Sequence, residues 1–570
     1  MHGGPGQQKI DLLVSRFKQK RYLEAETLAR SMTQRFPRYG FGWKALGVVL
    51  RQTGRSGDAL APMQKAAALS PGDAEAHYNL GNALRDLGQL DDVVASYRRA
   101  LEIRPDYAEA HNNLGNVLQD LGRLDDSLAS YRRALEIKPD YADAHYNLGK
   151  ALQDLGRFDD SLASCRRALE IKPDYAEAHN NLGAALQELG RLDDAVASCR
   201  RALEIKPDFV KAHYNLGNAL RDQGNLDESF QHYQRALALD QNNDNVRFSL
   251  TILYLLKGDL EPGWAGYEYR FTKRIEPIKK REFALPYWQG ESLEDKTILV
   301  WGEQGIGDEI MFASCLPQVI AASRHCTVEC SPRLETLFRR SFPQASIYAL
   351  TAGGEPPPAE REAGIDAQVA MGSLPQHLRR SRSDFPRHHG YLKADPERVQ
   401  VWRERLAALG PGLKVGISWQ GGTLKTRRPT RSIPLAQWAL LLQSAGVQCV
   451  SLQYTECSAE IAAVESATGV HIADWREVRD DLEHTAALIT ALDLVISVCT
   501  AAIHLGGALG RPVWVLAPYS PEWRYGIAGD EMPWYPSVRV FRQPRFGAWE
   551  PVIAEVAQCL RALAGKGSNR

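Results

Sequence analysis

The chain has 570 residues, and its 69 Lys and Arg are balanced by 69 Asp and Glu, so the formal net charge is zero. This length has room for three or four domains of ordinary size, and the charge balance gives no overall field that would favour nucleic acid or an anionic membrane surface. The start, MHGGPGQQKI, lacks the pattern of an export signal, and no stretch approaches 18 apolar residues. We therefore expect no nucleic-acid partner, no membrane span and a cytoplasmic location.

The first half of the chain repeats itself every 34 residues. A tract that begins Pro-Asp-Tyr-Ala-Glu-Ala-His recurs nearly unchanged, and its prolines keep a constant interval: Pro37, Pro71, Pro105, Pro139, Pro173 and Pro207. This is the period of the helix-turn-helix tetratricopeptide repeat. One repeat cannot bury its own apolar face, so we predict an α-solenoid over residues 1–274, with about six good repeats and two degenerate ones. Its inner groove would accept an extended polypeptide.

The nine cysteines have no zinc-ribbon spacing, so we expect free thiols and no metal site. Cys165 and Cys199 stand where other repeats carry Tyr97 and Tyr131, and we interpret them as small packing residues.

One polar position recurs in each central repeat. The residue before Leu-Gly is an asparagine five times: Asn79, Asn113, Asn147, Asn181 and Asn215. A primary amide offers a donor and an acceptor together, so a row of amides at the repeat spacing can bind the backbone of an extended peptide. The alternative is local bonding between helices, and the two interpretations have about equal weight.

After Trp288 the pattern changes to apolar strands alternating with amphipathic helices. KTILVWGE, CTVEC, SIYAL and AQVAM form one series, a connecting helix covers about 395–409, and LKVGISW, QCVSLQY, VHIAD, LVISV and PVWVLAP form a second series. This βαβ order predicts two Rossmann-like domains with parallel sheets, at 275–395 and 396–570. Ligands bind such sheets beyond the carboxyl ends of the strands.

Three places at predicted strand ends suit a ligand. The first is the turn Trp301-Gly-Glu-Gln-Gly-Ile-Gly-Asp308, where Gly305 and Gly307 permit a close backbone approach and Asp308 stands at the start of a helix. The alternative is a plain tight turn with Asp308 as the helix N-cap. The second is the end of LVIS, after which Cys499 and Thr500 open a helix that carries His504. Its alternative is a capped helix with a buried histidine.

The third place is GISWQGG, which contains Trp419 and Gln420 and precedes a basic cluster: Lys425, Arg427, Arg428 and Arg431. Cations here could neutralise the phosphates of a leaving nucleotide, although a basic surface loop has the same composition. Trp523, Trp534 and Tyr535 could stack on a base or sugar, but core packing explains these aromatic residues nearly as well.

With these residues in view, the chain resembles bacterial tetratricopeptide-repeat glycosyltransferases, whose catalytic half is similar to family 9 heptosyltransferases of the two-domain GT-B fold. The distinctive segments are GEQGIGDEIMF, GISWQGG with RSIPL, DLVISVCTAAIHLGGALGRPVWVL, and PEWRYG with PWYPSVRVFRQP. The repeat half is similar to that of protein O-GlcNAc transferases, where the asparagine row holds the acceptor polypeptide.

The resemblance implies a role for several positions. Asp308 falls on the aspartate near the acceptor hydroxyl, which makes it the candidate general base on the acceptor side, 275–395. Thr500 and His504 fall on the donor-binding helix of the nucleotide-sugar side, 396–570. Cys499 replaces the aspartate of that pattern, which leaves the donor sugar open.

The leading hypothesis is an inverting, metal-independent glycosyltransferase. It would need no cofactor and would move a sugar from a nucleotide-sugar to Ser or Thr of a protein held by the repeats, flagellin being one acceptor that the resemblance makes plausible. A non-catalytic interaction protein with a degenerate GT-B half is one alternative, because Cys499 departs from the pattern. A transferase acting on glycans or lipid-linked glycans is another.

Overall fold

The structure is a computed structural model that describes residues 5–272, 278, 280, 281, 283–350, 364–422 and 428–567, with the backbone alone at 428, 429, 566 and 567. It divides into two compact units, Met1–Pro207 and Asp208–Arg570. We describe each unit by itself.

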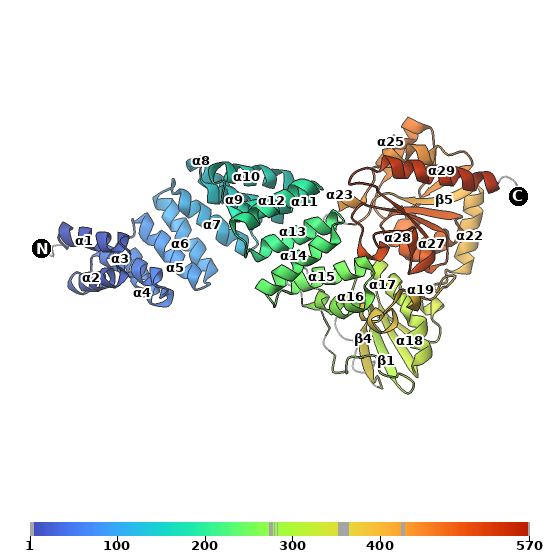
Figure 1. Ribbon diagram of the computed structural model, residues 1–570, viewed down its shortest axis with the longest axis horizontal. Coiled ribbons are helices and arrows are strands. Elements are labelled where there is room, and N and C mark those ends of the chain that lie inside the picture. Colours follow the sequence, from blue (N-terminus) through green and yellow to red (C-terminus); the bar gives the residue numbers. More distant parts are fainter. Residues whose placement is uncertain are drawn as a thin grey trace. The chain divides into compact units, whose positions relative to one another are not determined.

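The first unit is a run of paired helices (Figure 1). Successive pairs are the two helices of one repeat, and the last four pairs follow the 34-residue period directly. Their bounds are α1 Gln7–Lys18, α2 Tyr22–Arg35, α3 Gly40–Gln52, α4 Ser56–Leu69, α5 Ala74–Asp86, α6 Leu90–Ile103, α7 Ala108–Asp120, α8 Leu124–Ile137, α9 Ala142–Asp154, α10 Phe158–Ile171, α11 Ala176–Glu188 and α12 Leu192–Ile205.

Small residues let the two helices of a repeat approach closely. A Cβ on Gly115 of α7 would lie 2.6 Å from the ring of Tyr131 on α8, and a Cβ on Gly183 would lie 2.4 Å from the sulfur of Cys199. Cys165 and Cys199 are buried in the positions that tyrosine fills elsewhere, which confirms that they are packing residues. All nine cysteines are free thiols.

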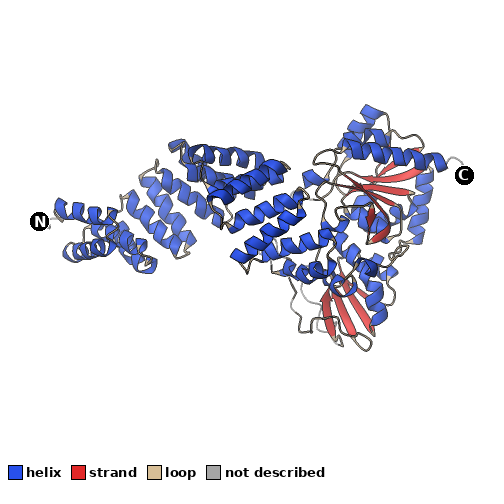
Figure 2. Ribbon diagram, in the orientation of Figure 1, coloured by secondary structure: helices blue, strands red, loops and turns tan. Residues whose placement is uncertain are grey.

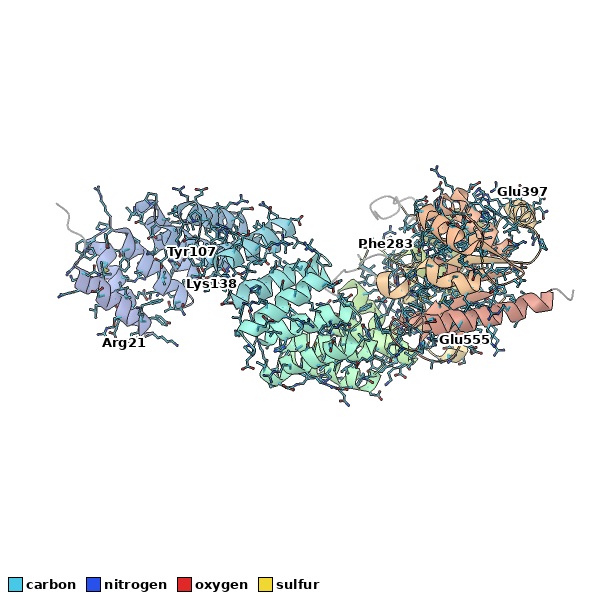
Figure 3. The ribbon with its side chains drawn as sticks, turned by 90° about the horizontal axis from the view of Figure 1, so that it is seen from above. Arg21, Tyr107, Lys138, Phe283, Glu397 and Glu555 are labelled. Atoms are coloured by element: carbon cyan, nitrogen blue, oxygen red, sulfur yellow. The ribbon has the colours of Figure 1, made fainter. Side chains whose placement is uncertain are left out.

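A histidine fastens the turn that leads into each central repeat. The ring of His111 contacts the carbonyl oxygen of Pro105 at 3.0 Å, and His145 and His179 repeat this contact at 2.9 Å. Lys138 and Tyr107, labelled in Figure 3, lie in these turns, after α8 and before α7. The recurring Pro-x5-His spacing is therefore a structural feature of the repeat, and we assign it no catalytic role.

The second unit begins with the last helices of the solenoid. These are α13 Val210–Asp222, α14 Leu226–Leu239, α15 Asp244–Lys257, α16 Leu260–Tyr267 and the 3-10 turn η1 Glu268–Phe271. They share a core with the α/β region, because Trp264 is 1% exposed and its indole N–H donates to the carbonyl oxygen of Arg379 at 2.8 Å.

The α/β region contains two separate sheets, drawn in red in Figure 2. The smaller has four parallel strands in the order β3-β2-β1-β4. Its strands are β1 Thr297–Trp301, β2 His325–Cys330, β3 Ser346–Ala349 and β4 Ala367–Ala370. Its helical segments are α17 Ile306–Phe312, η2 Ala313–Cys315, α18 Leu316–Ala322, α19 Glu335–Ser341, η3 Met371–Ser373, α21 Pro375–Leu378 and η4 Arg382–Asp384.

The larger sheet has seven strands in the order β10-β11-β9-β8-β5-β6-β7, all parallel except for the pair β10–β11. The strands are β5 Leu413–Ser418, β6 Val447–Ser451, β7 Ile472–Ala473, β8 Leu494–Val498, β9 Val513–Ala517, β10 Glu531–Met532 and β11 Tyr535–Arg542. The helical segments are α22 Pro396–Ala407, α23 Arg428–Arg431, η6 Leu435–Trp438, α24 Ala439–Leu442, α25 Ser458–Thr468, α26 Arg476–Asp480, α27 Leu482–Ala491, α28 Ala501–Ala508, η7 Trp523–Tyr525 and α29 Glu550–Gly567.

The predicted fold class is confirmed: a tetratricopeptide solenoid precedes an α/β region with two mainly parallel sheets, consistent with two Rossmann-like domains. The sequence analysis missed the edge strands β10 and β11 and the helix α29. The predicted boundaries at 274 and 395 stay predictions. No helix among the residues described is both long and apolar enough to cross a membrane.

We expect Gly115→Ala to destabilise the first unit. The added methyl group would overlap the ring of buried Tyr131, and overpacking of this kind costs about 1–3 kcal/mol. The matched control is Gly57→Ala on α4, where nothing lies within 4 Å of the new Cβ and helix propensity predicts a gain of about 0.5–1 kcal/mol. Urea unfolding followed by circular dichroism measures both, and equal midpoints for the two variants would contradict the packing account.

Candidate functional site

Four strands from the two sheets end at one place. The glycine turn and α17 follow β1, Trp419 to Gly422 follow β5, Cys499 and Thr500 follow β8, and the segment 518–525 follows β9. The helices α17 and α28 are in contact, so the carboxyl-terminal edges of the two sheets face the same region. This is where parallel sheets bind ligands.

Glycine permits the contact between the two helices. A Cβ on Gly307 would lie 3.2 Å from Cδ2 of His504 and 3.6 Å from the Cα of Ala501. The N-cap of α17 is Gly305, whose carbonyl oxygen accepts from the backbone N–H of Asp308 at 2.9 Å. Asp308 therefore lies in the first turn of the helix, and the alternative interpretation of this residue as the N-cap is wrong.

Asp308 is paired with an arginine from the other sheet. Arg524 donates from Nε to Oδ1 of Asp308 at 2.8 Å, and from Nη2 to the same oxygen. The side chains of Asp308 and Arg524 are 22% and 13% exposed. Burial alone would lower the pKa of Arg524, but the Asp308 carboxylate more than offsets it, so the pKa is raised and the cation is held.

The pair continues as a row of alternating charges. Arg524 Nη1 donates to Oε2 of Glu522 at 2.9 Å, and the other oxygen of Glu522 accepts from Arg431. The row Asp308–Arg524–Glu522–Arg431 links the smaller sheet to two loops of the larger one. Opposite charges at these distances stabilise one another where burial removes water.

His504 lies directly beside this row. It is 5% exposed, and its Nδ1 is 3.2 Å from the hydroxyl of Tyr535. Burial, reinforced by the positive charge of Arg524, lowers the pKa of His504 to about 4. The ring is therefore neutral near pH 7 and can take part in hydrogen bonds without adding charge.

Thr500 caps the helix α28, which is the alternative that the sequence analysis left open, and its contact with a donor stays a prediction. It is the N-cap of α28, its hydroxyl accepts from the N–H of Ala502 at 3.3 Å, and it lies 2.9 Å from the hydroxyl of Ser497. Cys499 is buried beside it, and burial raises the pKa of its thiol to about 11, so it is not a thiolate near pH 7.

The glycine-rich turn after β5 packs against this helix start. A Cβ on Gly421 would lie 2.7 Å from the carbonyl oxygen of Cys499. Trp419 is fully buried, and its indole N–H and the Nε2 of Gln420 both donate to Oε2 of Glu460, at 2.8 and 2.7 Å. Both side chains hold the turn in place, and their predicted contact with a donor stays a prediction.

Much of the predicted basic cluster cannot be placed. Lys425 and Arg427 lie outside the described residues, as does the side chain of Arg428. Arg431 is described and pairs with Glu522.

Two buried acids stabilise the glycine turn that follows β1. Glu303 accepts from Arg270 at 3.2 Å and from the N–H of Gly372 at 3.2 Å. Glu309 is 2% exposed and accepts from the N–H of Ser331 at 2.8 Å. Burial raises the pKa of Glu309 to about 8, so this carboxyl group is largely protonated at neutral pH.

Sequence reasoning missed the charged partners. Glu522 and Arg524 stand in PEWRYG, a segment that was interpreted through its aromatic residues and the family resemblance, with no charged partner assigned to either residue. Trp523 and Trp534 pack with Trp264 at ring-centroid distances of 5.3 and 6.1 Å and are largely buried, so in this structure they are core residues. An acid and an arginine two residues apart after a parallel strand were the available signal.

The asparagines lie at the same position on the first helix of each repeat, as predicted, with Asn215 in the second unit. Two amides bond to the preceding repeat: Nδ2 of Asn113 donates to the hydroxyl of Tyr78 at 2.9 Å, and Nδ2 of Asn147 donates to Asn112 at 3.0 Å. Nδ2 of Asn181 is buried without a hydrogen-bond partner among the residues described. The inter-repeat alternative therefore has direct support, and peptide binding stays a prediction.

Across the described ranges, no group of three or more His, Cys, Asp or Glu side chains is arranged to hold a metal ion.

We expect the ring of His504 to stay neutral down to about pH 5. Its pKa of about 4 in the folded chain lies below the value of about 6.5 in an unfolded chain. Protons therefore bind the unfolded state more strongly, and the folded chain loses stability as the pH falls from about 6.5 to about 4. Histidine-selective NMR of the wild-type chain and of His504→Gln, which identifies the resonance, measures the titration. A midpoint near pH 6.5 would contradict the buried environment.

Comparisons with known proteins agree with this architecture. Family models described as "TPR repeat" match residues 81–122 and 116–156, and models described as "Tetratricopeptide repeat" match 11–74, 146–208, 210–243 and 63–95. Protein FlbA of Caulobacter vibrioides is 34% identical over 333 residues, which are 56% of this chain and 55% of the relative. The chain thus spans about half the length of the curated relative that it matches.

Solved structures match part of the helical repeats. MamA is 25% identical with a TM-score of 0.27, over 29% of this chain and 97% of MamA. YrrB, described as a TPR protein with an unusual peptide-binding site, is 24% identical with a TM-score of 0.29, over 33% and 96%. A thermophilic TPR protein of Thermus thermophilus is 24% identical with a TM-score of 0.28, over 32% and 99%. The family models therefore identify tetratricopeptide repeats between residues 11 and 243, the chain is similar to FlbA over about half of its length, and an α/β region of parallel sheets follows the repeats.

Proposed function

We propose that the protein is an inverting glycosyltransferase of the GT-B type. It moves a sugar from a nucleotide-sugar to a Ser or Thr hydroxyl of a protein that the repeats hold. The acceptor side is the sheet that precedes Asp308, and the donor side is the sheet that precedes Thr500 and His504.

One observation carries the proposal: a carboxylate from one parallel sheet and a helix start from the other meet at the carboxyl ends of their strands. Asp308 and Arg524 are in direct contact, and Gly307 packs on His504. A nucleotide-sugar bound at the start of α28 would therefore have its sugar near the carboxylate. From the resemblance to GT-B transferases, we expect Asp308 to be the general base and Thr500 and His504 to bind the donor.

The reaction needs little more than positioning and one proton acceptor. The acceptor oxygen forms a bond to the anomeric carbon while the bond from that carbon to the phosphate oxygen breaks, and its electron pair leaves with the nucleoside diphosphate. Asp308 takes the proton of the hydroxyl. Attack on the face opposite the leaving group inverts the configuration, and arginines can stabilise the charge on the diphosphate.

The asparagine row remains the proposed contact for the acceptor polypeptide. The Nδ2 atoms of Asn113 and Asn147 are committed to the preceding repeat, so their amide oxygens are the groups that would accept from a peptide N–H. Flagellin is the acceptor that the family resemblance suggests.

A second candidate function is a non-catalytic interaction protein. Cys499 in place of the family's aspartate, and the ion pair that Asp308 already makes, are the observations in its favour. Transfer to a glycan or a lipid-linked glycan is a third, in which the repeats serve assembly alone.

We expect Asp308→Asn to reduce sugar transfer about 10²–10⁴-fold, because loss of a general base costs this much while the shape of the side chain is kept. The assay is transfer from UDP-, GDP-, ADP- and CMP-sugars to flagellin, followed by mass spectrometry of the acceptor. Asp126→Asn, which removes a carboxylate from an exposed pair with Arg123, is the matched control and should keep full activity. Transfer by Asp308→Asn at the wild-type rate would show that the general base is another group.

Replacing Asn113, Asn147 and Asn181 together with Ala should weaken acceptor binding at least about tenfold, since each amide is expected to contribute about 0.5–1.5 kcal/mol. Donor hydrolysis in the absence of acceptor should not change. Tyr78→Phe is the matched control, because it removes one inter-repeat partner of Asn113 but keeps the amide and its bond to Oδ1 of Asn82 at 3.3 Å. Fluorescence anisotropy with labelled flagellin measures the affinity, and equal loss in the triple variant and in Tyr78→Phe would assign the row to repeat packing.

A further inference from the structure

We propose that Arg524 binds the diphosphate of the donor and that it gives up Asp308 when it does so. The carboxylate of Asp308 is then freed from its arginine partner only after the donor has arrived. This inference rests on the proposed function and names a residue and a regulatory step that the function itself does not require.

The ion pair of Asp308 conflicts with its proposed role as the general base. A general base must accept a proton, but the carboxylate of Asp308 is already engaged by the guanidinium group of Arg524. Both bonds from Arg524 go to Oδ1 of Asp308. Among the described residues no donor bonds to Oδ2, so this oxygen can still accept a hydrogen bond while Arg524 holds Oδ1.

The contacts of Arg524 allow it to exchange one partner for another. Its guanidinium is shared between Asp308 and Glu522, and it lies 4.8 Å from the ring centre of Trp523, which supports one face of the group. A guanidinium fork fits a phosphate as well as a carboxylate. A diphosphate can therefore take the bonds that Asp308 now makes, while Glu522 and Trp523 keep the arginine in place.

The positions of the two cations support the same exchange. Arg431 and Arg524 both donate to Glu522, so their guanidinium groups lie close together, and Gly307 of the helix that carries Asp308 packs on His504 of α28. Neutral His504 adds no charge there. A diphosphate at the N-terminus of α28 would face these two arginines, and Arg524 is the one that also touches the candidate base.

The consequence is an order of events. Donor binding moves Arg524 from Asp308 to the phosphates, and the freed carboxylate can then accept the proton of the acceptor hydroxyl. The nucleoside diphosphate leaves with the electron pair of the broken bond and stays paired with Arg524 until it dissociates. Deprotonation of the acceptor without a donor in place is thereby disfavoured.

An exchange of Arg524 between Asp308 and phosphate predicts a change in phosphate affinity that a fixed ion pair does not. If Asp308 competes with phosphate for Arg524, removal of the carboxylate charge must tighten the binding of phosphate. Isothermal titration calorimetry of the full chain with UDP, GDP, ADP and pyrophosphate, at one salt concentration, measures this without any turnover. We expect Asp308→Asn to lower the Kd of the bound nucleotide about fivefold or more, and Arg524→Gln to raise it about tenfold or more.

Two further variants make the result specific. Arg524→Lys keeps a charge but loses the fork, and it should bind with an intermediate Kd. Asp126→Asn, in the exposed pair with Arg123, controls for the loss of one negative charge and should leave the Kd unchanged. Circular dichroism checks that each variant is folded.

The outcomes separate this inference from the proposed function. Tighter binding by Asp308→Asn supports the exchange, also where the wild-type chain binds too weakly to measure. Nucleotide binding that Asp308→Asn leaves unchanged or weakens overturns the exchange but leaves the transferase proposal standing. Absence of binding by every folded variant, for all four probes, overturns both.

Discussion

The site exists because two helices from different sheets can come within side-chain contact at a glycine. Gly307 on α17 packs on His504 of α28, and a Cβ there would already press on the ring. Through this contact the carboxyl-terminal edges of a four-stranded and a seven-stranded sheet are held together. Every proposed role of Asp308, Thr500 and Arg524 depends on that closeness, since the residues come from three separate strand ends.

The charged residues of the site lie close together and are partly buried, so each one is placed beside a residue of opposite charge. Asp308, Arg524 and Arg431 are each less than a quarter exposed, and a partly buried charge without a partner is costly. The row solves this by giving every charge an opposite neighbour, while burial keeps His504 neutral and Glu309 largely protonated. The result is a site that is stable without ligand, and any anionic ligand must compete with carboxylates for the arginines.

The sequence predicted those parts of the fold that repeat or alternate. The 34-residue period and the apolar strands predict the helix pairs and the succession of strands along the chain almost without tertiary information, because each follows from local burial. The strand β11 was missed because PWYPSVRVFRQP mixes proline and arginine with apolar residues, and the edge strand β10 because it has only the two residues Glu531 and Met532. Asp308 and Thr500 were predicted because they follow strands, whereas the pairing of Asp308 with Arg524 joins residues 216 positions apart and cannot be read locally.

The end of the solenoid is built into the α/β region and is not a separate attachment. Tyr267 donates from its hydroxyl to Gln304 of the glycine turn at 3.1 Å, and buried Arg270 pairs with Glu303 of the same turn. At α13, Asp222 accepts from Ser520, two residues before Glu522. The last repeats therefore support both the turn that presents Asp308 and the loop that presents Arg524. The last helices of the solenoid, the glycine turn and the loop of Arg524 are therefore parts of one packed structure.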